Sequence, residues 1–158
     1  MTILSLFQWL GHTSVGLAMR HSTWGVAVVE MVHLLALAVL GGTIVLVDLR
    51  LFGIGLKRQP AARLAHELSP LFGGSLGILV FSGVLIVSAE PMKCYHSAAF
   101  RAKMLLLVIA ILFHFTLHRS AVTSATQKIS TASSKLAAAL SLALWLSVGL
   151  AGRAIGFL

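Results

Sequence analysis

The stretch WGVAVVEMVHLLALAVLGGTIVLVDLR, residues 24–50, is an apolar run longer than a lipid bilayer requires. A helix of about 20 residues crosses a hydrocarbon core of roughly 30 Å. Further apolar runs follow at residues 69–89, 99–119 and 135–154, separated by polar connections. We therefore predict an all-α fold with one membrane domain over residues 1–158, an integral membrane four-helix up-down bundle.

The composition agrees with a membrane protein. Of the 158 residues 58% are hydrophobic and only 10% are charged, and the mean hydropathy is +0.98, far above the range of soluble domains. The single cysteine, Cys94, excludes an intrachain disulfide and any site that needs several thiolates. Haem or copper held by histidine stays compatible with this composition.

The net charge of +8 comes from basic residues that cluster between the apolar runs. We interpret them as topology signals and contacts to lipid headgroups, and we expect membrane lipids and no nucleic acid as partners. The first and third connections carry seven Lys and Arg residues, against five on the opposite side. This bias predicts a multi-pass protein of a bacterial inner (cytoplasmic) membrane, with both termini in the periplasm.

Residues 3–19, ILSLFQWLGHTSVGLAM, place apolar side chains at helical spacing on one face and polar ones on another. This pattern predicts an amphipathic helix that lies in the membrane interface. A signal peptide is disfavoured, because no basic residue precedes the apolar part.

Histidines inside the apolar runs are the main candidates for chemistry. His33 lies in the first run, and His114 and His118 end the third run in the segment HFTLH. A spacing of four residues puts His114 and His118 on one helix face. Membrane bundles usually hold haem b by one histidine from each of two helices, so haem iron is the metal that we expect these residues to bind.

Depth along the helices favours one pairing. At about 1.5 Å of rise per residue, His33 lies roughly 13 Å along the first span. On the same scale His114 lies roughly 21 Å and His118 roughly 27 Å along the third span. His33 therefore matches His114 better than His118. His66 lies at the same membrane face as His118 and is the reserve ligand that would pair with it. If both pairings form, the chain holds two haems.

Other residues near the spans are candidates for the periphery of such a site. His96 and His21 would complete an outer haem site if His33 is shallower than its residue count indicates. Charged or aromatic groups that would contact a haem propionate or a quinone are Lys103, Arg153, Arg50 and Trp145.

Several motifs together resemble a family of small, four-helix bacterial inner-membrane proteins, known mainly as a domain of unknown function. They are VEMVHLLALAVLGGTIVLVDLRLFG, AARLAHELSP, AFRAKMLLL, LHRS and SLALWLSVGLAGRAIGF, and the likeness covers about residues 20–157. The resemblance implies no activity. It marks as site residues His33, Asp48, Arg50, Lys103, His118, Trp145 and Arg153.

The resemblance and the depth estimate favour different residues. The family pattern is expected to carry asparagine and small or apolar residues near Phe113 and His114, so it favours His118 as the ligand where depth favours His114. The leading hypothesis is a small b-type cytochrome with one or two haems, which passes electrons between quinone and a redox partner protein or within a homo-oligomer. The alternative is a cofactor-free membrane subunit or small transporter whose histidines handle protons or bind copper.

Overall fold

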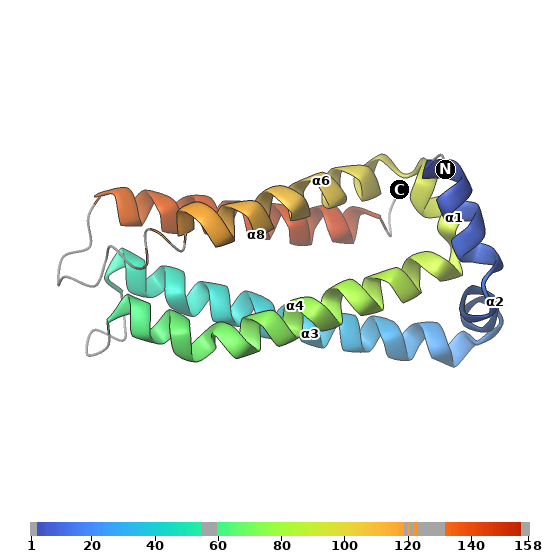
Figure 1. Ribbon diagram of the computed structural model, residues 1–158, viewed down its shortest axis with the longest axis horizontal. Coiled ribbons are helices and arrows are strands. Elements are labelled where there is room, and N and C mark those ends of the chain that lie inside the picture. Colours follow the sequence, from blue (N-terminus) through green and yellow to red (C-terminus); the bar gives the residue numbers. More distant parts are fainter. Residues whose placement is uncertain (1–2, 55–59, 119, 121, 123–131, 156–158) are drawn as a thin grey trace.

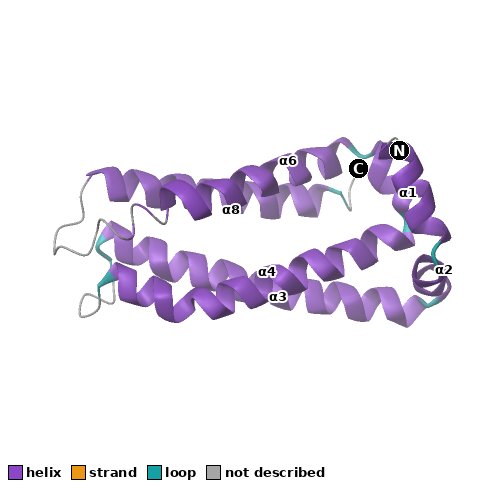
Figure 2. Cartoon of the chain, viewed as in Figure 1, coloured by secondary structure: helices purple, strands orange, loops and turns teal. Residues whose placement is uncertain are grey.

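The computed structural model describes residues 3–54, 60–118, 120, 122 and 132–155 of the chain. Every element in these residues is helical (Figure 2). Four helices are long and apolar enough to cross a membrane. They are α3 (Thr23–Phe52), α4 (Ala61–Ala89), α6 (Ala98–Phe113) with its continuation η1 (His114–His118), and α8 (Ala132–Ala154). The expectation of an all-α fold with four such helices is confirmed.

The long helices form two pairs (Figure 1). α3 packs along α4, α6 packs along α8, and α8 also contacts α3. Successive long helices run in opposite directions, so the start of α3 and the end of α8 lie at the same end of the molecule. The short helices α1 (Ile3–His12), α2 (Ser14–His21) and α5 (Pro91–His96) lie at that end.

Local sequence signals set the ends of the long helices. The side chains of Ser22 and Ser97 cap α3 and α6 by accepting hydrogen bonds from the backbone N–H groups of Gly25 (3.0 Å) and Phe100 (3.2 Å). α3 ends at Gly53, whose φ of 83° is a left-handed conformation that glycine adopts without steric cost.

The amino-terminal segment differs from the expected single helix over residues 3–19. The structure has α1 and α2, with a break at Thr13. The Thr13 hydroxyl donates to the Leu10 carbonyl (2.7 Å) and accepts from the Gly16 N–H (3.1 Å). These local bonds end one helix and cap the next, because Ser and Thr side chains compete with helical backbone bonding.

Two connections are also more helical than expected. α4 begins at Ala61, not near residue 69, so the segment AARLAHEL belongs to the helix. Pro60 fixes its start, and an exposed Arg63–Glu67 pair at 2.9 Å supports its first turns. The connection EPMKCYH contains α5, with Pro91 in its first turn. The expected connection over residues 120–135 lies largely outside the described residues.

Cys94 lies in α5 and is buried. Burial raises the pKa of its thiol, and the negative charge of Glu90 adds to the effect. A raised pKa keeps the thiol protonated at neutral pH, so Cys94 behaves as a small apolar side chain.

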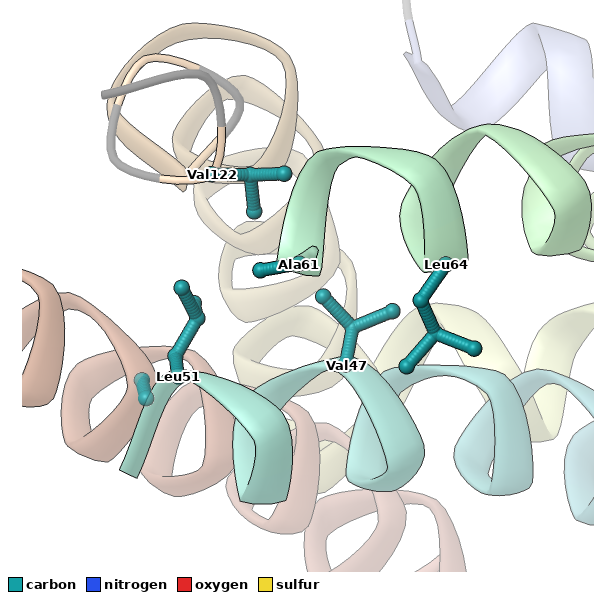
Figure 3. Packing of buried hydrophobic residues seen from close by; sticks show 6 residues of the cluster. Val47, Leu51, Ala61, Leu64 and Val122 are labelled. Carbon is teal, nitrogen blue, oxygen red and sulfur yellow. The ribbon is translucent and has the colours of Figure 1, made fainter. Parts of the chain in front are cut away.

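The core lies where α3, α4 and α8 meet. One cluster joins Val47 and Leu51 of α3 to Ala61 and Leu64 of α4, and Figure 3 shows Val47 and Leu64 pointing toward each other. Its other members are Val122 and Ala138. A second cluster, nearer the middle of α3, contains Leu40, Ile44 and Phe72, with Leu142 and Trp145 of α8 packed against it.

Close backbone contact holds α2 against the end of α4. Arg20 Nε donates to the carbonyl oxygen of Ala89 (3.2 Å). A Cβ atom on Gly16 would lie 2.7 Å from the backbone oxygen of Leu10 and 3.0 Å from that of Ser88. Only glycine permits this approach, because neither oxygen belongs to a side chain that could rotate away.

We predict that Gly16→Ala lowers the free energy of unfolding by about 1–3 kcal/mol, the usual cost of overpacking. Thermal unfolding in detergent measures the effect. Gly41→Ala is the matched control, because a Cβ atom there has no atom within 4 Å. Equal melting temperatures for the two variants would contradict the close contacts of α2 with α1 and α4.

Candidate functional site

Asp48 and His118 form a buried ionisable pair in the bundle. His118 Nε2 lies 2.6 Å from Asp48 Oδ1, and the two side chains are 2% and 0% exposed. A carboxylate only accepts hydrogen bonds, so Nε2–H of His118 donates to Asp48. The contact joins α3 to η1, 70 positions apart in the sequence. It is the only ion pair with both members buried among the described residues.

A change in helix type presents His118 to Asp48. Residues His114–His118 form a π-helix at the end of α6, a local widening that is frequent at functional sites. The rings of His114 and His118 stack with centroids 5.0 Å apart, which confirms that they share one face. His114 also stacks on Phe72 of α4 with centroids 4.0 Å apart. The π-helix thus contacts α3 through His118 and α4 through His114.

Apolar and aromatic side chains enclose this group. Phe72 contacts Trp145 of α8 edge to face, with ring centroids 6.1 Å apart. Asp48 lies on α3 between Ile44, which belongs to one core cluster, and Leu51, which belongs to the other. Such surroundings lower the local dielectric constant and strengthen the Asp48–His118 interaction.

His33 forms a separate polar centre. Its Nδ1 lies 2.8 Å from the hydroxyl oxygen of Ser82, and that hydroxyl donates to the carbonyl of Ile78 at 2.6 Å. Because the Ser82 proton is engaged with Ile78, Nδ1–H of His33 is the donor to Ser82. Nε2 of His33 therefore carries the free lone pair.

The structure does not bring His33 together with His114 or His118. His33 bonds Ser82, whereas His118 bonds Asp48, which lies 15 residues further along α3. That separation corresponds to about 22 Å of helix. The described residues contain no group of three or more His, Cys, Asp or Glu side chains arranged to hold a metal ion.

The remaining predicted site residues are dispersed. Lys103 of α6 is half-buried and passes over Gly152 of α8, where a Cβ atom would lie 3.3 Å from its Nζ. His66 is exposed on α4, near the end opposite α5. Arg50 is half-buried and follows Asp48 on α3, whereas Arg153 is exposed at the end of α8. His21 and His96 are both exposed.

Sequence reasoning did not identify the partners of the histidines. The resemblance marks Asp48 as a site residue but does not link it to His118. A carboxylate inside an apolar run was the available signal. Ser82 and Phe72 carried no signal, because serine and phenylalanine are ordinary residues of membrane helices.

We predict that Asp48→Asn lowers the free energy of unfolding by about 3 kcal/mol or more, because it removes one member of a buried charge pair. Denaturation in detergent measures the loss. Glu67→Gln, which breaks the exposed pair with Arg63, is the control and is expected to cost less than about 1 kcal/mol. Equal losses would show that the Asp48–His118 contact contributes no more than a surface pair.

Comparisons with known proteins give one match. No curated protein and no solved structure matches the chain. The model of a family of unknown function, DUF6644, matches residues 4–158. The match extends from the beginning of α1 to the end of the chain and includes both polar centres. The chain therefore belongs to DUF6644, a family of unknown function.

Proposed function

We propose that the protein is a multi-pass protein of a bacterial inner membrane, in which the four long helices span as an up-down bundle. Large apolar side chains on their outer faces support this proposal, among them Leu34, Phe81 and Leu150, which are 63%, 68% and 72% exposed. Trp9 and Trp24 are 59% and 82% exposed at the end formed by α1 and α2, as expected at a membrane interface. The Lys and Arg bias supports a periplasmic location for that end.

The function that the geometry supports best is proton handling, as a cofactor-free membrane subunit or a small transporter. The observation that carries it is the buried Asp48–His118 contact of 2.6 Å with His114 stacked beside it. Ionisable groups within a span are costly to place there and usually mark ion or proton pathways. Histidine is the side chain that gains and loses a proton near neutral pH.

Charge balance in the pair gives it a proton-dependent state. When His118 is protonated, its positive charge compensates the Asp48 carboxylate. When His118 is neutral, the carboxylate keeps only a hydrogen bond and its charge is no longer balanced. Each proton therefore changes the net charge of a water-poor region by one unit, which favours movement of a helix or of a second ion to restore the balance.

The stacked imidazoles limit the site to one proton at a time. Two imidazolium rings with centroids 5.0 Å apart repel each other strongly at low dielectric constant. Asp48 bonds His118 and not His114. The proton therefore rests on His118, beside the carboxylate, and occupies His114 only transiently during transfer. In this order His118 is the resting site of the proton and His114 is the acceptor during transfer.

We predict that the purified protein in liposomes raises the rate of proton entry above that of protein-free vesicles when a membrane potential is applied. Asp48→Asn and His118→Ala should abolish most of this rate, because each removes one side of the pair. A pH-sensitive dye inside the vesicles measures it. The control is His12→Ala, which changes an exposed histidine of α1. A wild-type rate equal to that of empty vesicles would contradict the proposal.

A second candidate function is electron transfer through haem b, and the orientation of His33 supports it. Ligating histidines usually donate one ring N–H to a neighbouring acceptor and bind the metal with the other nitrogen. Nδ1 of His33 donates to Ser82, which leaves Nε2 for iron. His118 also donates one ring N–H, from Nε2 to Asp48, but the structure does not bring His118 together with His33. Haem supplies one-electron chemistry when bound.

Under this second proposal, one haem or two would be held within the bundle or at contact with another copy of the chain. Lys103 lies near enough to His33 to interact with it electrostatically and would pair with a haem propionate. The second iron ligand would come from a redox partner or from a second copy of the chain. Arg50, Arg153 and Trp145 would serve a bound quinone.

We predict for this candidate that protein produced with added haem precursor shows a Soret band, and an α band after reduction. His33→Ala should remove both bands, and Ser82→Ala should weaken haem retention because Nδ1 of His33 loses its acceptor. His12→Ala should keep both bands. A wild-type spectrum without a Soret band would exclude haem b and leave the proton proposal standing.

A further inference from the structure

Four buried polar atoms near the Asp48–His118 pair have no hydrogen-bond partner among the described residues. They are Asp48 Oδ2, His114 Nδ1, Ser141 Oγ and Trp145 Nε1. Asp48 and Ser141 are fully buried, with exposures of 0%. An unpaired buried polar group lowers stability, because it loses its hydrogen bonds to water on folding. Such groups are rare in folded proteins and call for a partner.

The four atoms lie in one region of the bundle. Ala138 of α8 packs in the cluster with Val47 and Leu51, whereas Leu142 and Trp145 pack against the cluster with Leu40 and Ile44. α3 and α8 run in opposite directions, so Ser141 lies at the level of Ile44 to Asp48 on α3. Ser141 and Trp145 are four residues apart and share a face of α8.

Ring contacts connect His114 to the same region. His114 stacks on Phe72, and Trp145 contacts Phe72 edge to face. His114 also stacks on His118, which bonds Asp48. The unpaired atoms of α3, η1 and α8 therefore lie in the same part of the bundle.

The mixture of donors and acceptors identifies the class of ligand. Trp145 Nε1–H can only donate, so it disfavours a cation. The Asp48 carboxylate can only accept, so it disfavours an anion. Ser141 can do both. A small neutral molecule that donates to Asp48 and accepts from Trp145 satisfies the set, and water within protein interiors typically makes two to four such bonds.

We propose that this region binds structural water, which bridges Asp48 Oδ2, Ser141, Trp145 and His114. His118 bonds only Oδ1 of Asp48, and the bound water donates to Oδ2. The water also links Asp48 to Nδ1 of His114, the ring that does not touch the carboxylate directly. The use of this water as a route for protons rests on the proposed function, whereas its presence does not.

Radiolytic footprinting tests for the water directly. X-rays generate hydroxyl radicals from bound water, so buried side chains beside it are oxidised and gain heavy oxygen from water labelled with ¹⁸O. The full-length protein in lipid nanodiscs is irradiated in such water, and labelling is read by mass spectrometry. We expect Trp145 and His114 to be labelled although bulk water does not reach Trp145 Nε1 or His114 Nδ1.

Two serines of α8 provide a matched pair of variants. Ser141→Val replaces the hydroxyl that would bind the water with methyl groups. It should reduce labelling of Trp145 and His114 several-fold. Ser147→Val is the control, because the Ser147 hydroxyl already donates to the Ala143 carbonyl at 2.7 Å. An unchanged melting temperature in detergent shows that a variant is folded. If Ser141→Val fails this criterion, Trp145→Phe replaces it, with labelling of His114 as the readout.

The outcomes distinguish the presence of the water from its proposed use as a route for protons. Absence of label at Trp145 and His114 in the wild-type protein, or equal labelling in Ser141→Val and Ser147→Val, would overturn the inference. Loss of label in Ser141→Val supports it, whatever the rate of proton entry. Label without any proton entry in the wild-type protein would retain the water and remove the proposed function.

Discussion

The contact between Asp48 and His118 constrains the rest of the bundle, because it holds two ionisable side chains together away from water. Leaving either one without the other would place an uncompensated charge in an apolar core. Its two members come from α3 and from the end of the α6 segment. The contact therefore fixes how the pair formed by α6 and α8 sits on the pair formed by α3 and α4.

The secondary structure near His118 serves this contact. A π-helix replaces the last turn of α6 and carries both histidines. One ring bonds the carboxylate of α3 and the other stacks on Phe72 of α4. Ser141 and Trp145 add polar atoms from α8. All four long helices thus contribute to one polar centre, and the second centre, at His33, lies on the half of α3 and α4 nearer α1 and α2.

The four long helices could be predicted from sequence because bilayer thickness sets the length of an apolar run. The shared face of His114 and His118 followed from their spacing. The Asp48–His118 contact did not follow, because periodicity within one helix does not identify its partner on another. Depth does not identify it either: Asp48 lies about 36 Å along the first span and His118 about 27 Å along the third, a mismatch as large as that between His33 and His114. The break at Thr13 and the early start of α4 depended on local bonds and prolines that hydropathy does not record.

The double-mutant cycle of Asp48→Asn and His118→Gln tests the central contact most directly. Free energies of unfolding are measured in detergent for the wild-type protein, both single variants and the double variant. A direct buried pair predicts a coupling energy of about 2 kcal/mol or more, since contacting residues are not additive. Additive losses, with a coupling energy below about 0.5 kcal/mol, are typical of independent sites and would contradict the contact.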